Sequence, residues 1–145
     1  MGRSTLLQWN CRGNKANIDD VDLLIPKSNP LVLCLQEIYL KNVNISLFRK
    51  YSFCNKIGSA IENKHQVKSP LWWTNLKKSI PLSEIKLNTK MQAVAIIAFI
   101  PKTITICSIY LLPNLHWETK HLEEVMVQLI PRFILMRDFN AHSNL

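Results

Sequence analysis

A strand pattern, a helix pattern and a second strand pattern fill the first 37 residues, and this order constrains the fold more than any other feature. Leu6–Asn10 predicts a first strand that ends in a polar residue, and residues 31–35 form a continuous apolar run that predicts a second strand. Between them apolar residues recur at helical spacing after Asn17, an N-cap residue, and Pro26 and Pro30 are expected to close the helix. Strand, helix and strand within about 30 residues predict a right-handed parallel crossover, so we expect an α/β fold.

The last third of the chain predicts a hairpin, a helix and a final strand. Residues 92–100 and 103–111 are rich in β-branched residues and are joined by Pro101 and Lys102, which indicates an antiparallel hairpin. Apolar residues then recur at helical spacing over 117–129, and Pro131 is expected to stop that helix. The helix includes His121, to which we assign little weight as a ligand.

The middle of the chain, from Tyr39 to Leu87, predicts less. Residues 51–57 are compatible with a strand. Further on, Trp72 and Trp73 stand among lysines without clear periodicity. Aromatic residues among basic ones can stack on nucleic-acid bases, but the same two tryptophans can also belong to the core, and we favour the core.

Size and composition indicate one globular domain. The chain has 145 residues, of which 48% are hydrophobic, and the longest apolar run, residues 93–100, is too short to span a membrane. Polar residues return too early after Met1 for a signal peptide, so we expect an intracellular protein. The cysteines lack the paired spacing of a zinc site and are expected to be buried free thiols; they are Cys11, Cys34, Cys54 and Cys107.

The positive charge is concentrated in residues 41–90. This segment has ten Lys or Arg residues against two acidic ones, so it carries the whole net charge of +8, while the rest of the chain is balanced. Such a segment suits a polyanion, because phosphates neutralised by Lys and Arg release counterions. A solvated, solubilising surface is the alternative explanation.

Polar residues that follow apolar strands form the candidate site. Residues 133–136 are apolar and stop at Arg137-Asp138, with Asn140 two residues after the acid. Open α/β sheets bind ligands at the carboxyl ends of their strands. A helix N-cap or an Asx turn is the alternative explanation for this Asp and Asn. Polar residues also end or follow the other predicted strands. We therefore expect that one edge of the sheet brings together Asn10, Glu37, Tyr110, Asp138 and Asn140.

These residue types suit phosphodiester hydrolysis. A hard cation such as Mg²⁺ binds one or two carboxylates and retains several waters, and it can orient a phosphate and stabilise the leaving oxygen. A nearby amide and phenol can hold phosphate oxygens or a water. The chain has no nucleophile elbow for acyl transfer and no Gly-rich loop for a redox cofactor.

Four motifs, in order along nearly the whole chain, resemble the endonuclease domain that opens the polyprotein of jockey-like non-LTR retrotransposons. That domain belongs to the endonuclease/exonuclease/phosphatase superfamily, whose fold is the DNase I-like α/β sandwich. The motifs are Gln8-Trp9-Asn10-Cys11-Arg12-Gly13, Leu33-Cys34-Leu35-Gln36-Glu37, Ser108-Ile109-Tyr110-Leu111-Leu112-Pro113 and Asp138-Phe139-Asn140-Ala141-His142-Ser143.

The resemblance implies a role for each matching residue. Glu37 would bind the divalent metal, Mg²⁺ or Mn²⁺, with help from Asn10, which would also hold the phosphate. Tyr110 would contact the scissile phosphate, and Asp138 with Asn140 would orient and activate the attacking water. The residues expected to contact nucleic acid are Arg12, Lys77, Lys78 and His142. The family nicks target DNA, and the free 3′ end primes reverse transcription.

Three departures from the family pattern bear on activity. Arg137 stands where the family has Gly, and an Arg that reached the Asp138 carboxylate would lower its pKa and make it a poorer base. Residues 64–70 replace an expected glycine pair. The family's second half, with further metal and water ligands and an Asp-His pair that supplies the base, is not matched by any of the 145 residues.

We therefore expect residues 1–145 to form a partial DNase I-like domain, the first half of a metal-dependent DNA-nicking endonuclease, truncated and inactive alone. The family is expected to act in the nucleus. In the family a reverse transcriptase domain follows the endonuclease domain, and these 145 residues contain no such segment. The alternatives are a non-catalytic nucleic-acid-binding module using residues 41–90, and a phosphatase or sphingomyelinase of the same superfamily. We also expect the two hairpin strands, 92–100 and 103–111, to expose apolar side chains where the other half would lie.

Overall fold

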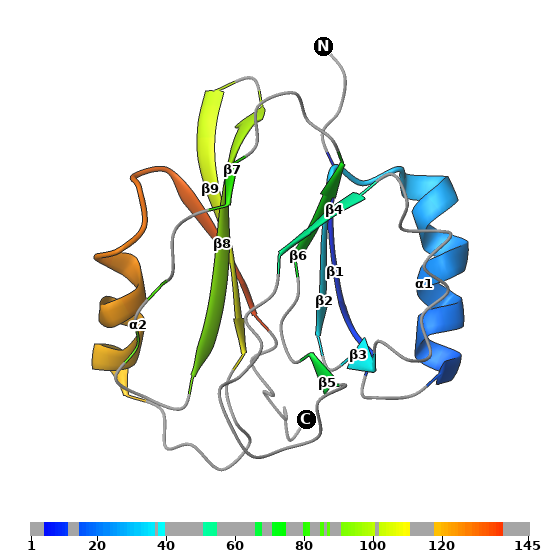
Figure 1. The fold of residues 1–145 in the computed structure, drawn as a ribbon, viewed down its shortest axis with the longest axis horizontal. Coiled ribbons are helices and arrows are strands. Elements are labelled where there is room, and N and C mark those ends of the chain that lie inside the picture. The colour runs from blue at the N-terminus through cyan, green and yellow to red at the C-terminus, as the bar shows by residue number, and fades with distance from the viewer. Residues whose placement is uncertain are drawn as a thin grey trace, which may run out of the picture.

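Two β-sheets lie face to face, and each carries one helix on its outer side (Figure 1). This arrangement was obtained as a computed structural model. The structure describes residues 5–11, 15–36, 38–39, 51–54, 66–67, 71–74, 80–81, 85, 87, 91–100, 102–110 and 118–137.

The first sheet has the strand order β1-β2-β6-β4. Strands β1 (Leu6–Asn10) and β2 (Val32–Gln36) are parallel, and α1 (Lys15–Ser28) connects them, which confirms the predicted crossover. Strand β6 (Leu71–Thr74) runs antiparallel to β2, and β4 (Tyr51–Cys54) pairs with its other edge. The two adjacent tryptophans are therefore on an inner strand; their side chains lie outside the described part of the structure.

The second sheet has the order β10-β9-β8-β7. The predicted hairpin is confirmed as β8 (Gln92–Ile100) and β9 (Lys102–Tyr110), paired along their whole length. Strand β7 (Ile80–Pro81) pairs with β8, and the final strand β10 (Phe133–Arg137) runs parallel to β9. Helix α2 (Thr119–Met126) precedes β10. A separate pair of two-residue strands consists of β3 (Ile38–Tyr39) and β5 (Gln66–Val67).

Helix α1 continues past the proline that was expected to close it. Pro26 lies inside the helix, two residues before its end. Helix interiors tolerate proline poorly because it has no N–H to donate and its ring crowds the carbonyl of residue i−4. The helix ends instead at Asn29, whose φ of 40° is in the left-handed region and whose N–H donates to the oxygen of Ile25 at 2.8 Å. This is a helix C-cap built on asparagine.

Helix α2 begins with a reciprocal cap. The backbone N–H of Glu118 donates to Nδ1 of His121 at 3.1 Å, and the Glu118 side chain accepts from the backbone at His121. His121 is buried and serves the helix start, in agreement with the low weight given to it as a ligand. Neither helix in the described part of the chain is long and apolar enough to cross a membrane.

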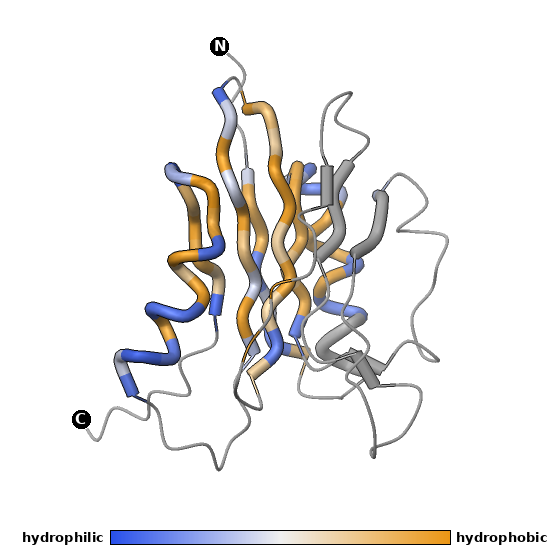
Figure 2. The backbone as a smooth tube through the Cα atoms, turned by 60° about the vertical axis from the view of Figure 1, so that its left-hand side comes forward, coloured by the Kyte–Doolittle hydropathy of each residue, from blue (hydrophilic) through white to orange (hydrophobic). Residues whose placement is uncertain are grey.

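An inner core fills the space between the sheets. Alternate residues of each strand point inward, and Figure 2 shows the apolar residues along the strands. From the first sheet, Val32 and Cys34 of β2 enter this core, and both have no exposed surface. The residues that meet them from the second sheet are Val94, Ile96, Ala98, Ile106 and Met136.

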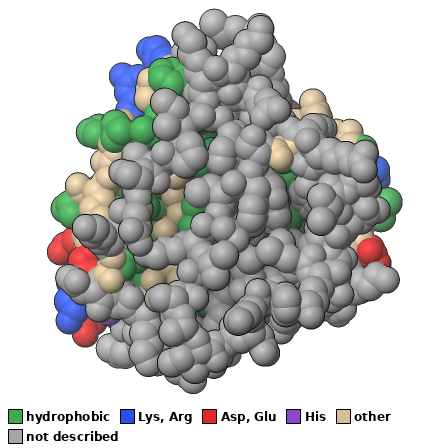
Figure 3. All heavy atoms as spheres, in the orientation of Figure 1, with side chains coloured by type: hydrophobic (Ala, Val, Ile, Leu, Met, Phe, Trp, Pro, Cys, Tyr) green, Lys and Arg blue, Asp and Glu red, His purple; other side chains and the backbone are tan. Residues whose placement is uncertain are grey.

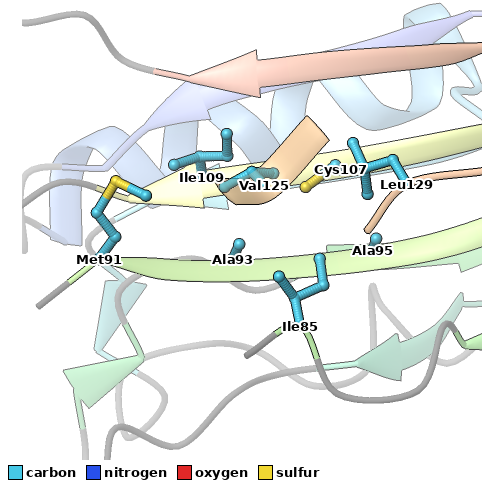
Figure 4. Packing of buried hydrophobic residues seen from close by; sticks show 8 residues of the cluster. All are labelled: Ile85, Met91, Ala93, Ala95, Cys107, Ile109, Val125 and Leu129. Carbon is cyan, nitrogen blue, oxygen red and sulfur yellow. The ribbon is translucent and has the colours of Figure 1, made fainter. Parts of the chain in front are cut away.

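Two outer cores lie beneath the helices. Leu33 and Leu35 of β2 pack against Val21 and Ile25 of α1. Beneath α2, Figure 4 shows the side chains of Ile85, Met91, Ala93, Ala95, Cys107, Ile109, Val125 and Leu129 in one cluster. Both faces of β8 and β9 are thus covered.

The expectation that these two hairpin strands expose an apolar face is therefore wrong. Their inward side chains are covered by β2 and their outward ones by α2. Phe99 is a partial exception, at 43% exposure, and it lies next to the end of β8. In the described part of the chain, no strand pairs with the outer edge of β1 or of β10.

Candidate functional site

The carboxyl ends of β1 and β2 lie side by side. The parallel register aligns Asn10, the last residue of β1, with Gln36, the last residue of β2. The pairing extends one residue further, since the N–H of Cys11 donates to the main-chain oxygen of Gln36 at 2.8 Å. Glu37 follows Gln36 directly in the chain but lies outside the described residues.

The carboxyl ends of β9 and β10 are paired in the same way. Ile109 of β9 is aligned with Arg137 of β10, and Tyr110 ends β9. Asp138 follows Arg137 in the chain; both it and Asn140 lie outside the described residues. The two strands are parallel because α2 intervenes between them.

Two polar contacts join these pairs of strands across the interior. The Gln36 amide donates from Nε2 to the main-chain oxygen of Ile109 at 3.1 Å, and Sγ of Cys34 lies 2.7 Å from Oγ of Ser108. Residues 34 and 36 thus meet residues 108 and 109 in ascending order, so β2 and β9 run in the same direction. All four strands therefore end at the same end of the molecule, the lower end in Figure 1.

The alternation of side chains decides what faces this end. Leu6 contributes to the inner core whereas Leu7 and Trp9 pack under α1, so Asn10 is on the inner face of its sheet. On β9, Ile106 is in the inner core, which gives Tyr110 the inward direction as well; it is 8% exposed. The structure thus brings two predicted site residues, one amide and one phenol, to the same end of the interior.

Arg137 belongs to the opposite face. Phe133 and Leu135 pack with the cluster under α2, while Met136 enters the inner core. Arg137 therefore lies on the same side of β10 as Phe133 and Leu135, the side that faces α2. Asp138 follows it outside the described residues, so the contact between Arg137 and the Asp138 carboxylate stays a prediction.

The predicted nucleic-acid contacts stay predictions. Arg12, Lys77, Lys78 and His142 all lie outside the described residues, as do the ten basic residues of segment 41–90. Among the side chains that can be seen in Figure 3, acidic groups lie at the two lateral margins, over α1 and α2. Exposed acidic residues of these two helices are Asp19 and Asp20 on α1 and Glu123 on α2.

The described residues at this end carry amide oxygens but form no complete metal centre. They contain no group of three or more His, Cys, Asp or Glu side chains that could hold a metal. Amide and carbonyl oxygens of the kind that Asn10 and Gln36 carry suit a hard cation such as Mg²⁺. The donor chemistry at this end fits such an ion, and Glu37 would supply the carboxylate.

Sequence reasoning missed Gln36. The residue has no exposed surface, and its Oε1 has no hydrogen-bond partner in the described structure. The predicted strand 31–35 stops before Gln36, whereas Gln36 is the last residue of β2. Its spacing of two from Cys34 and four from Val32 was the available signal, because this spacing places it on the inner face.

Three buried thiols are present among the described side chains, at Cys11, Cys34 and Cys107, and all are free. Burial raises the pKa of Cys34 to about 12, against a smaller lowering by the Ser108 hydrogen bond. Burial likewise raises the pKa of Cys107 to about 12. Thiols of this kind are poor nucleophiles and poor metal ligands, in agreement with the structural role expected for them.

Comparison with known proteins gives similarity in structure only. No family model matches the sequence, and no curated protein matches it. The endonuclease domain of TRAS1, a telomere-specific non-LTR retrotransposon, matches with a TM-score of 0.70 at 21% identity, over 95% of this chain and 61% of that one.

Two further structures extend the match. D. rerio TDP2 complexed with a single-strand DNA product has a TM-score of 0.63 at 18% identity, over 94% of this chain and 61% of that one. An endonuclease/exonuclease/phosphatase family protein from Bacteroides thetaiotaomicron has a TM-score of 0.61 at 13% identity, over 92% and 62%. The chain thus spans less than two thirds of each of these structures. Its fold is the DNase I-like α/β fold of the endonuclease/exonuclease/phosphatase proteins.

Proposed function

We propose that the chain forms part of a divalent-metal-dependent phosphodiesterase that nicks DNA, of the kind found in non-LTR retrotransposons. The observation that carries the proposal is the common end of β1, β2, β9 and β10, fixed by the hydrogen bond from Gln36 to Ile109. Four strands whose ends carry, or directly precede, Asn10, Glu37, Tyr110 and Asp138 meet there. Ligands bind at such carboxyl ends in α/β sheets.

The proposed roles are those that the motif resemblance implies, and the chemistry of each side chain suits its role. The Glu37 carboxylate is the metal ligand, and the Asn10 carboxamide holds a phosphate oxygen beside it. The Tyr110 hydroxyl donates a hydrogen bond to the scissile phosphate, and Asp138 with Asn140 orients the attacking water. The ion, Mg²⁺ or Mn²⁺, supplies charge stabilisation for the phosphate and the leaving oxygen.

The proposal also names the substrate and the step that follows the nick. The similarity to a retrotransposon endonuclease domain and to a protein bound to a DNA product supports DNA as the substrate. We further propose that the nick primes reverse transcription in the nucleus, as the motif resemblance implies. A separate reverse transcriptase activity would then act on the free 3′ end.

The experiment that tests the proposal is metal titration by calorimetry, followed by DNA binding. Mg²⁺ or Mn²⁺ should bind the wild-type chain, and Glu37→Ala should abolish that binding because it removes the carboxylate ligand. Glu123→Ala is the matched control, since Glu123 is an exposed carboxylate on α2. Equal metal affinity in wild type and Glu37→Ala would refute the proposed site.

The same samples separate the alternatives. DNA binding that is unaffected by metal and by Glu37→Ala would favour the non-catalytic nucleic-acid-binding module. Hydrolysis of a phosphate monoester, with no binding to DNA, would favour a phosphatase. The retrotransposon-endonuclease proposal requires that metal increases the affinity for DNA and that Glu37→Ala removes the increase.

A further inference from the structure

The final strand, β10, is an edge strand of the second sheet, and no other strand in the described structure pairs with its outer side. The N–H of Thr105 donates to the main-chain oxygen of Arg132 at 2.9 Å, and the register aligns Thr105 with Phe133. In a parallel ladder this pattern directs the main-chain N–H and C=O of Ile134 toward β9. The main-chain groups of Phe133 and Leu135 therefore point the other way, to the outer edge of the sheet.

Exposed apolar side chains gather on the same part of the chain, at the end of α2 and on β10. Six large hydrophobic residues of the described structure are exposed, and four of them fall within nine consecutive positions: Met126, Val127, Ile130 and Ile134. A strand edge with outward main-chain groups is a template for a further strand, and exposed apolar residues indicate a contact surface.

We propose that a second copy of this chain occupies the edge. The two β10 strands pair antiparallel about a two-fold axis at Leu135, and the two second sheets become one continuous sheet. A two-fold contact uses the same residues on both copies, which requires a self-complementary surface. This inference does not rest on the function proposed above.

The outward main-chain groups match in this register. The N–H and C=O of Leu135 bond to those of Leu135 in the second copy, and the N–H of Phe133 donates to the oxygen of Arg137. A carbonyl oxygen has two lone pairs, so it accepts this bond beside any other that it makes. On the inner face, Ile134 is aligned with Met136 of the second copy, and the contact covers the exposed side of Ile134.

The charges at the ends of the strand also match. Arg137 of one copy is aligned with Phe133 of the other, and a guanidinium group stacks favourably on an aromatic ring. One step further, position 132 is aligned with position 138, which are Arg132 and Asp138 in the sequence. A shift of the register by two residues in either direction removes both matches. The net charge of +8 comes from residues 41–90, and the rest of the chain is balanced.

Exchange of main-chain amide protons in the wild-type chain tests the pairing directly. Sedimentation velocity gives the fraction of dimer at each concentration. The amides of Phe133 and Leu135 should exchange roughly tenfold more slowly where about 90% of the chain is dimeric than where it is monomeric, because exchange then proceeds through the remaining monomer. The amide of Asn29, which is bonded to Ile25 at the end of α1, is the control and should not change.

The contact is small, so the concentrations must be high. A strand of five residues buries less than the roughly 1,200–2,000 Å² of a stable interface, and the dimer should dissociate in the micromolar range or above. A chain that stays monomeric at about 1 mM would overturn the proposal. If a synthetic peptide of alternating threonine and valine then protects the amides of Phe133 and Leu135, the edge takes a foreign strand and the second copy is refuted.

A charge exchange tests the register. Arg132→Glu sets two acidic residues against each other across the contact, and Asp138→Lys sets two basic ones, so each variant alone should weaken the dimer roughly tenfold or more. A one-to-one mixture of the two variants aligns opposite charges at both ends and should restore the dimer. Lys27→Glu makes the same reversal on the exposed surface of α1 and should leave the dimer intact.

Each result of the charge exchange decides the register. Two folded variants that dimerise as well as the wild type, or whose mixture stays monomeric, would refute the axis at Leu135. If either variant does not fold, the exchange of Phe133 and Leu135 in the wild type decides alone.

Discussion

The thiol of Cys34 and the hydroxyl of Ser108 lie 2.7 Å apart, although they belong to different sheets. Both side chains have no exposed surface, so the contact is made in the interior. On the other face of β9, Cys107 is equally buried under α2. The ionised form of either thiol would be poorly solvated, and burial accordingly raises both pKa values from 9.0 to about 12.

The first prediction is a loss of stability at alkaline pH. Each thiol has a higher pKa in the folded chain than in the unfolded one, so its contribution is fully present below pH 9.0 and decreases as the pH rises toward about 12. The free energy of unfolding should fall by roughly 1.4 kcal/mol per pH unit for each thiol in that window. Urea titrations at several pH values measure the slope.

Cys107→Ala provides the control for this slope. It should remove about half of the thiol contribution and leave the remainder, which comes from Cys34. Tyr51, whose pKa is also raised by burial, adds a smaller effect from about pH 10. A free energy of unfolding that stays constant from pH 9 to pH 11 would contradict the burial of both thiols.

The second prediction concerns the hydroxyl of Tyr51, which donates a hydrogen bond to the main-chain oxygen of Pro30 at 2.9 Å. This contact ties β4 to the turn between α1 and β2. Tyr51→Phe should lower the free energy of unfolding by about 1 kcal/mol, because it removes the donor and leaves a buried carbonyl. Val127→Ala, at a residue 81% exposed, is the control and should change nothing measurable.

Sequence periodicity predicted the strands well because each apolar run is bounded by polar residues. β1 begins and ends where it was expected, and β8 and β9 differ from their predicted bounds by one residue at most. Strand direction also followed, since a helix between two strands requires a crossover. The common end of β1 with β2, and that of β9 with β10, is a consequence of these local rules, whereas the contact between Gln36 and Ile109 shows that both pairs end on the same side.

Other features depend on contacts that periodicity does not report. Pro26 was expected to end α1, but packing of Ile25 against the first sheet keeps the helix intact to Ser28. The burial of Gln36 depends on its partner Ile109, which is 73 positions away in sequence. Long-range pairs of this kind have no local signature, so the apolar run 31–35 did not indicate that Gln36 is buried.

The third prediction is that the 145-residue chain does not nick supercoiled plasmid in the presence of Mg²⁺. The motif resemblance assigns the general base to a segment outside these residues, and a positioned base contributes about 10²–10⁴-fold to the rate. Agarose gels of plasmid incubated with the purified chain measure this. Robust nicking that disappears in Glu37→Ala would show that the residues present are sufficient.

The fourth prediction tests the inner core with two residues of one strand. Met136 is 6% exposed and packs between the sheets, whereas Ile134, two positions earlier on the same face of β10, is 37% exposed. Met136→Ala should therefore lower the free energy of unfolding by about 2–5 kcal/mol, since it leaves a cavity that the two sheets cannot close. Ile134→Ala should lower it by about 1 kcal/mol or less, because solvent already reaches that side chain. Urea unfolding with an unchanged m-value gives both numbers. Equal losses in the two variants would mean that the first sheet covers β10 evenly along its length, or that it does not pack on β10 at all. Either result would contradict the face-to-face arrangement of the sheets from which the common strand end was derived.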